Sequence, residues 1–217
     1  MSGLRKQLVE QIREKVLTGE IGVGRENATS ETKLAELFDI SRVPVREALT
    51  VLADRQLVEQ FPQRGVAARR ISAGEALEAI RYCSAIEMSV VHYLTEEERL
   101  VESKRVADDI QTFRSDVEGL ESAVEEGPDY VLLRETALHR NVAQSAGFLT
   151  GGRSIEEFRD CVHLYQRTSA PLPEEDLRDI PRANMRWFDA LSKLSREECE
   201  ASLSELFDPR VPQLDRI

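Results

Sequence analysis

Hydrophobic residues recur at helical spacing through the first 55 positions, in three groups separated by polar turns. The first group predicts a helix of about four turns that ends near Gly19. It consists of Leu4, Leu8, Ile12, Val16 and Leu17. After a loop over residues 20–30, Ser30 is a suitable N-cap for a short helix from Glu31 to Phe38. A tight turn over residues 39–41 then leads to a third helix from Arg42 to about Arg55, with Ser41 as its N-cap.

The hydrophobic pattern changes its period after Gln56. Residues 57–61 and 66–69 are typical of two short strands, and the sequence Pro62-Gln63-Arg64-Gly65 is typical of the turn between them. Two helices, a tight turn, a third helix and a β-hairpin, in this order, predict a winged helix-turn-helix domain for residues 1–71.

From Ser72 onward the pattern is helical only. A capping signal at residues 72–75 opens the first helix, and the pattern predicts helices over about 73–95, 96–121, 127–146, 151–169, 182–194 and 195–207. The segment from Thr168 to Pro181 contains three prolines and is predicted to be a connection. The sequence therefore predicts a mostly α protein with a small β-wing, in which residues 72–217 form an all-α helical bundle.

Charge is unevenly distributed between these two parts. The whole chain carries a net charge of −11, but residues 1–71 contain 12 Lys and Arg against 10 Asp and Glu, a balance of +2. The remaining residues carry −13. Only the N-terminal part therefore has a charge suited to approaching phosphates.

Neither the hydrophobic pattern nor the cysteines indicate a membrane or secreted protein. No apolar run is long enough to span a bilayer, and the first residues lack the apolar stretch of a secretory signal. Cys83, Cys161 and Cys199 are widely spaced, which favours reduced thiols over disulfides or a zinc site. We expect a cytoplasmic protein.

Basic and polar residues gather where a winged helix-turn-helix contacts DNA. Arg42 and Arg46 are four residues apart at the start of the third helix, where guanidinium groups can contact guanine edges or phosphates. An alternative is a merely solvated helix face, with Arg46 paired to Glu47 or Asp39. The predicted DNA-binding residues are Thr32, Lys33, Ser41, Arg42, Arg46, Gln63, Arg64 and Gly65. In this set Arg64 is suited to entering a minor groove of DNA, and Gly65 allows the turn to approach the DNA backbone closely.

The spacing of these residues resembles that of a known family. The string that carries the resemblance is Ser30-Glu31, Leu34-Ala35, Phe38, Ser41-Arg42, Pro44-Val45-Arg46-Glu47-Ala48-Leu49, Leu52, Leu57-Val58 and Arg64-Gly65. It is similar to the N-terminal signature of GntR-family regulators. The resemblance implies a homodimer that binds a short inverted repeat in double-stranded DNA, read mainly by Arg42 and Arg46. Thr32 departs from the pattern of some relatives, which have an arginine there, so a weaker contact is expected.

The helical part resembles the C-terminal domain of the FadR-type branch of that family, called the FCD domain. Residues 80–94 are similar to its first helix, and residues 187–191 to its penultimate helix. Many FCD domains hold a divalent metal through an Asp and three His. Glu135 and His139 fall at two of those four positions, and their spacing of four residues on one helix face suits a pair of metal ligands.

The other two metal positions hold Asn184 and Leu206, of which leucine cannot coordinate a metal. We therefore expect no metal cofactor, and instead a polar pocket, or a simple hydrogen bond between Glu135 and His139. An arginine of the family's first helix is replaced by Cys83, with Arg81 nearby as a substitute. The predicted effector-binding residues are Arg81, Glu135, His139 and Asn184.

Together these patterns predict a transcriptional regulator, a repressor that responds to a small-molecule effector. The chain lacks the nucleophile elbow, Walker loop and dinucleotide fingerprint of common enzyme classes, and we expect that it is not an enzyme. An alternative from another class is a helical ligand carrier or enzyme whose winged part binds protein. Salt-dependent binding to DNA separates the two hypotheses.

Overall fold

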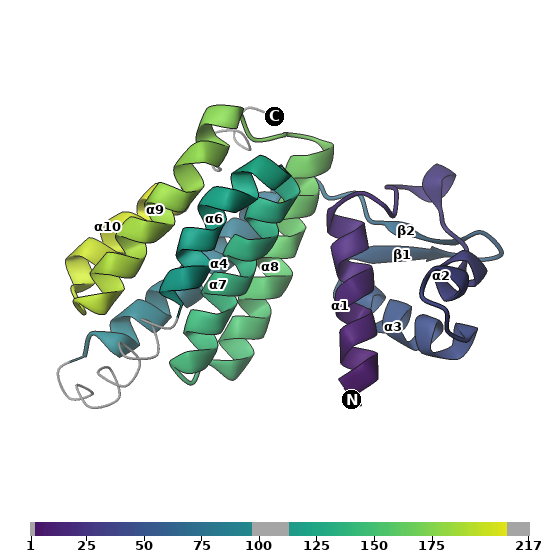
Figure 1. Ribbon diagram of the computed structural model, residues 1–217, viewed down its shortest axis with the longest axis horizontal. Helices are drawn as coiled ribbons and strands as arrows, with labels where there is room; N and C mark the ends of the chain where they lie inside the picture. Colours follow the sequence, from purple (N-terminus) through teal and green to yellow (C-terminus); the bar gives the residue numbers. More distant parts are fainter. Residues whose placement is uncertain (1–2, 97–112, 208–217) are drawn as a thin grey trace. The chain divides into compact units, whose positions relative to one another are not determined.

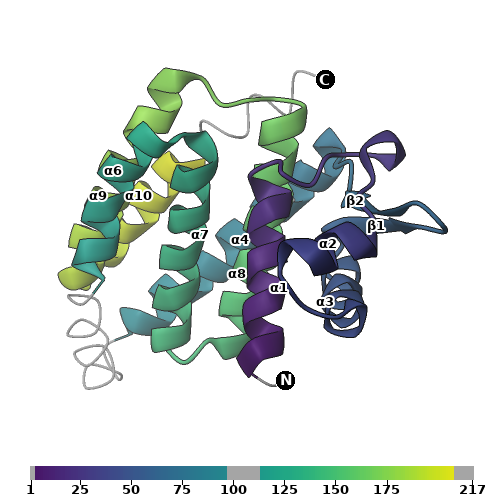
Figure 2. The same ribbon diagram turned by 45° about the vertical axis from the view of Figure 1, so that its right-hand side comes forward.

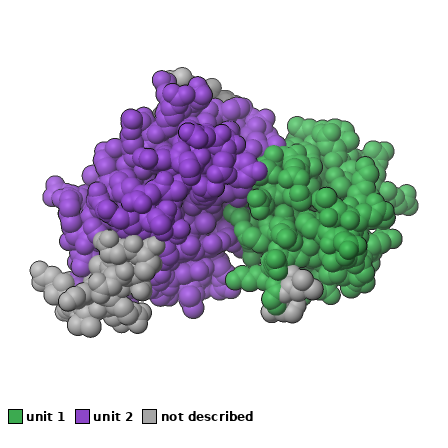
Figure 3. Space-filling view, in the orientation of Figure 1, with its two compact units in different colours: residues 1–71 green, residues 72–217 purple. Residues whose placement is uncertain are grey.

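The computed structural model describes residues 3–96 and 113–207, and the chain divides into two compact units. Unit 1 is Met1–Ile71 and unit 2 is Ser72–Ile217 (Figure 3). Among the described residues, no helix is both long and apolar enough to cross a membrane.

Unit 1 has the element order of a winged helix-turn-helix, as the sequence predicts (Figure 1). Its elements are α1 (Gly3–Leu17), η1 (Arg25–Asn27), α2 (Glu31–Leu37), α3 (Arg42–Asp54), β1 (Val58–Phe61) and β2 (Gly65–Ala68). The two strands pair antiparallel, with Val58 opposite Ala68 and Phe61 opposite Gly65. The wing is therefore a tight hairpin whose turn covers residues 62–64.

Local sequence explains where α2 and α3 begin. The Ser30 hydroxyl accepts a hydrogen bond from the Lys33 amide at 3.2 Å and so caps α2. Ser41 occupies the N-cap position of α3, but its side chain makes no capping bond there. The inner face of α3 is apolar and fully buried, through Val45, Ala48, Leu49 and Leu52.

Gly65 is required by the packing of the wing. Thr29 and Val66 exchange two backbone hydrogen bonds, of 2.7 and 2.9 Å, which hold the loop before α2 against the start of β2. Gly65 has a φ of +109°, and a Cβ at this position would lie 2.1 Å from the Thr29 carbonyl oxygen. A glycine is therefore needed here by the fold itself, before any contact with DNA is considered.

Unit 2 is entirely helical in its described residues (Figures 1 and 2). Its helices are α4 (Ala73–Leu94), α6 (Arg114–Glu126), α7 (Pro128–Ser145), α8 (Leu149–Thr168), α9 (Glu174–Ser192) and α10 (Arg196–Phe207). Helix α8 packs against α4 and α7, while α9 packs against α6 and α10. The helix predicted over residues 96–121 lies mostly outside the described residues, and α6 ends later than predicted, at Glu126.

The predicted connection from Thr168 to Pro181 is wrong in its second half. Helix α9 already begins at Glu174, and Pro181 lies inside it. The missing N–H of Pro181 costs one helical hydrogen bond, but Leu177 and Ile180 in the preceding turn are buried in a cluster with Val131 and Leu132 of α7. Burial of that turn outweighs the proline, a tertiary effect that the local sequence does not contain.

A network of buried charged groups ties four helices of unit 2 together. Glu87 of α4 accepts hydrogen bonds from the Arg159 guanidinium of α8 at 3.0 and 3.1 Å, and lies 2.8 Å from His139 Nδ1 of α7. Arg159 also lies 3.3 Å from Glu135 of α7, and Asn184 of α9 bonds both Glu135 and His139. We call these five residues the buried polar cluster.

Opposite effects act on the Glu87 carboxyl in this cluster. Burial alone raises its pKa, but the charges of Arg159 and His139 and a hydrogen bond with His139 outweigh burial and lower the pKa to about 2. Glu87 therefore stays ionised at neutral pH. Breaking one member of such a buried pair leaves the other charge without compensation, which costs about 3–5 kcal/mol.

The first prediction concerns Gly65. Gly65→Ala forces an L residue into positive φ and a Cβ against the Thr29 carbonyl, so we expect unit 1 to lose about 2 kcal/mol or more of stability. Urea unfolding of the full chain measures this loss. The control is Gly74→Ala, where an added Cβ meets nothing within 4 Å. Equal stability of the two variants would contradict the argument.

The second prediction concerns Glu87. Glu87→Gln should lower the free energy of unfolding at pH 7 by about 3–5 kcal/mol, because Arg159 loses its partner. Since folding lowers the Glu87 pKa from 4.5 to about 2, its contribution is complete above pH 4.5 and is lost as the pH falls towards 2. The difference from the native chain should therefore shrink below pH 4.5. Glu78→Gln, at an exposed position of the same helix, is the control, and a difference independent of pH would contradict the account.

Candidate nucleic-acid interface

A groove of about 520 Å³ lies between the starts of α2 and α3 and the β-hairpin of unit 1. Six of the eight predicted DNA-binding residues line it: Thr32, Arg42, Arg46, Gln63, Arg64 and Gly65. The other two, Lys33 and Ser41, are exposed at the first turns of α2 and α3 but do not line the groove. The fold thus brings residues from three separate sequence segments to one surface.

Glu31 lies between the two arginines of this groove. Its carboxylate accepts hydrogen bonds from Arg46 at 3.0 and 3.3 Å and lies 3.5 Å from the Arg42 guanidinium. The alternative pairing of Arg46 with Glu47 or Asp39 is therefore wrong, and Glu47 instead lies 3.6 Å from Arg5. A partner from the preceding helix reaches Arg46 because α2 and α3 pack closely.

The ion pair aligns the arginines without hiding them. The Arg42 and Arg46 side chains remain 59% and 61% exposed. The hydrogen bond from Arg46 lowers the pKa of Glu31, and the same bond raises the pKa of Arg46. Glu31 and Arg46 are therefore both charged at neutral pH. Sequence reasoning missed the role of Glu31, although the residue stands directly after the Ser30 cap.

The tip of the wing presents a third guanidinium. Gln63 has a φ of +64° and the Arg64 amide donates to the Phe61 carbonyl at 3.0 Å, which closes the turn. Gln63 and Arg64 are both exposed. The surface as a whole offers long, charged donors and exposed hydroxyls, which suits an extended anion such as a nucleic-acid backbone.

The predicted effector-binding residues separate into two groups. Glu135, His139 and Asn184 all lie in the buried polar cluster, where Asn184 bridges the other two. The structure does not bring Arg81 to them, because Arg81 is exposed on α4. Arg159 of α8 supplies the buried guanidinium instead. Sequence reasoning missed Arg159, since it looked for a substitute only on the helix that lacks the family's arginine.

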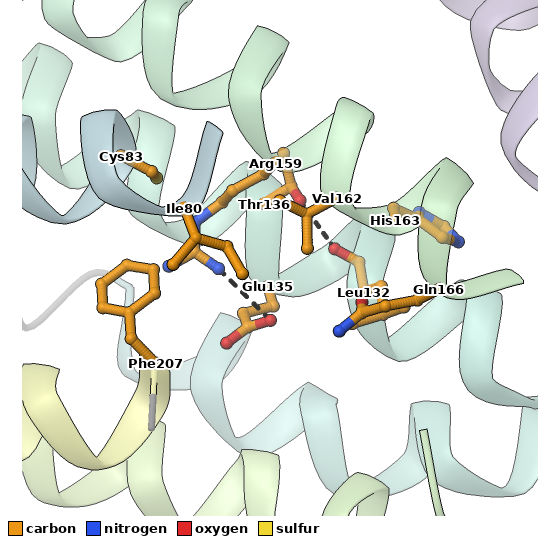
Figure 4. Close-up of a pocket in the computed structure, with 10 residues that line it drawn as sticks. All are labelled: Ile80, Cys83, Leu132, Glu135, Thr136, Arg159, Val162, His163, Gln166 and Phe207. Carbon is orange, nitrogen blue, oxygen red and sulfur yellow. Dashed lines mark hydrogen bonds and ion pairs between the residues drawn. The ribbon is translucent and has the colours of Figure 1, made fainter. Parts of the chain in front are cut away.

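A small cavity adjoins Glu135 and Arg159 (Figure 4). Figure 4 shows Arg159 reaching from α8 towards Glu135 on α7, with Phe207 on one side and Gln166 on the other. The cavity measures about 10 Å³, which is roughly the space of one water molecule. Gln166 Oε1 and His163 Nδ1 are buried beside it with no hydrogen-bond partner among the described residues.

The part of the chain that the structure describes contains no group of three or more His, Cys, Asp or Glu side chains arranged to hold a metal ion. In the cluster Glu87 and Glu135 both lie against the Arg159 guanidinium. His139 stacks on Trp187, with ring centroids 4.3 Å apart, and both of its ring nitrogens have partners. The side chains that could have served as metal ligands are therefore already engaged with other side chains of the protein.

Comparison with known proteins agrees with both units. Residues 4–67 match the family described as "Bacterial regulatory proteins, gntR family". A curated relative from Streptomyces ambofaciens, described as an uncharacterized HTH-type transcriptional regulator in an unstable DNA locus, is 34% identical over 93 residues. That match covers 43% of this chain and 39% of the relative.

Solved structures resemble the chain over its whole length. E. coli McbR/YncC has a TM-score of 0.78 at 18% identity and is matched over 99% of its length. A GntR regulator from Rhodococcus sp. RHA1 has a TM-score of 0.67 at 20% identity and is matched over 100%. At these identities the likeness concerns the fold alone, and it confirms a winged domain followed by an all-helical domain.

The matched family consists of regulatory proteins and not of enzymes, as the sequence predicts. The match falls on the unit that carries the groove, the two exposed arginines and the wing. The N-terminal unit of this chain therefore carries a domain of the GntR family of bacterial regulatory proteins.

Proposed function

We propose that this protein is a sequence-specific, DNA-binding transcriptional repressor of the cytoplasm. The observation that carries the proposal is the groove of unit 1, which two exposed arginines at the start of α3 line together with the arginine of the wing. The match of residues 4–67 to the GntR family supports it, because regulators of this family bind DNA.

In this proposal α3 enters the major groove, as the second helix of a helix-turn-helix does. Arg42 and Arg46 then exchange Glu31 for guanine N7 and O6 or for phosphate oxygens, while Arg64 at the wing contacts an adjacent minor groove. Thr32, Lys33 and Ser41 stand at the first turns of α2 and α3 and donate to phosphates. The acidic balance of unit 2 confines attraction for phosphate to unit 1.

We further propose that the protein acts as a homodimer and that unit 2 provides the dimer contact and the effector site. The family resemblance supports the dimer, since paired winged domains match an inverted repeat. The unpartnered Gln166 and His163 atoms beside the Glu135–Arg159 pair support a small polar effector. A cavity of about 10 Å³ has to open to admit one, so binding shifts the helices of unit 2 to another populated arrangement.

The third prediction tests the arginines. Arg42→Ala and Arg46→Ala should each weaken binding to a DNA site selected from random sequence by about 1–3 kcal/mol, and the double variant should lose the site preference. Fluorescence anisotropy at two salt concentrations measures both effects. Arg25→Ala is the control, because Arg25 is exposed on η1 away from the groove. Full site affinity of the double variant would refute the proposed mechanism.

The fourth prediction concerns Glu31. Glu31→Gln removes a negative charge from the groove and frees both guanidiniums, so the affinity for random DNA should rise. The salt dependence of this binding should also become steeper, corresponding to the release of up to about one more counterion. Discrimination between the selected site and random DNA should fall, because Arg46 loses its alignment. Glu36→Gln, exposed on the same helix and outside the groove, should change neither value. Weaker binding of the Glu31 variant to random DNA would contradict this role.

A further inference from the structure

One apolar side chain stands among the charged groups at the start of α3. Val43 is 65% exposed and lies in the first turn of the helix, directly after Arg42 and one turn before Arg46 and Glu47. Its neighbour Val45 is fully buried, so the core-facing side of α3 is already occupied without Val43. A single exposed valine is ordinary on a protein surface, and its exposure alone implies nothing.

The setting of Val43 points to a particular partner. The residues around it that reach solvent are hydrogen-bond donors and charges, which would contact base edges or phosphates and leave an apolar group unmatched. In the major groove, thymine presents the one apolar group of the base edges, its C5 methyl. A β-branched valine has few rotamers to lose, so it can cover a methyl at little entropic cost.

We propose that Val43 reads the C5 methyl group of a thymine next to the bases or phosphates contacted by Arg42 and Arg46. This inference rests on the proposed function and adds a specificity residue to it. Burying one methyl group against Val43 strengthens binding about fourfold. Arginines at this surface select guanine or bind phosphate regardless of sequence, so Val43 is the side chain that makes the site prefer thymine over cytosine at its own position.

The test uses the full chain and a duplex selected from random sequence. Each thymine of that duplex is replaced in turn by deoxyuridine, which lacks only the methyl group, and affinities are compared by anisotropy. We expect about a fourfold loss at one thymine of each half-site. Val43→Ala should bind the original duplex about fourfold more weakly and become indifferent to the replacement.

Leu37→Ala is the matched control, since Leu37 is a comparably exposed apolar residue, 57%, at the C-terminal end of α2 and not in the first turn of α3. It should keep the native ratio of thymine to deoxyuridine affinity. If every replacement is neutral, or if Val43→Ala still distinguishes the two bases, the inference is wrong while the proposed function stands. If sedimentation shows that Val43→Ala changes the mass of the protein's oligomer, while the ratio of thymine to deoxyuridine affinity stays unchanged, Val43 acts in self-association and the inference is also overturned. Failure of the native chain to select any DNA sequence overturns the proposed function, and this inference with it.

Discussion

Burial of one face of α3 is the constraint on which the candidate interface depends. Val45, Ala48, Leu49 and Leu52 are almost completely excluded from solvent, so the rotation of the helix about its axis is fixed. A different rotation would expose these side chains to water, at a cost in free energy of about 1.5–3 kcal/mol for each of the larger ones. The opposite face, with Arg42, Val43 and Arg46, has to face outward as a result.

The two units use charge in opposite ways. In unit 1, Glu31 holds Arg42 and Arg46 at the surface, where water screens the pair and a competing phosphate can replace the carboxylate. In unit 2, Glu87, Arg159 and Glu135 are sealed in the core, where the same kind of pair is costly to break. The surface pair is suited to exchange with a ligand, and the buried pairs are suited to holding α4, α7 and α8 in one arrangement.

The sequence alone was sufficient to predict the elements that local patterns determine. The elements of unit 1 are predicted nearly to the residue from the helical spacing of Leu8, Ile12 and Val16, the Ser30 cap and the Pro62–Gly65 turn. Each of these signals depends only on residues a few positions apart in the sequence. Glu31 with Arg46, 15 residues apart, and Glu87 with Arg159, 72 apart, depend on how helices pack and leave no periodic signal. Pro181 was misread for the same reason, since the burial of Leu177 and Ile180 that tolerates it comes from α6 and α7.

The most direct measurement of the central claim, that the outer face of α3 enters the major groove, is protection of guanine N7 from dimethyl sulfate in a bound duplex. Guanine N7 lies in the major groove only. The account predicts protected guanines within each selected half-site, and their exposure again when Arg42 and Arg46 are both replaced by alanine. Specific binding that leaves every guanine N7 reactive would contradict it.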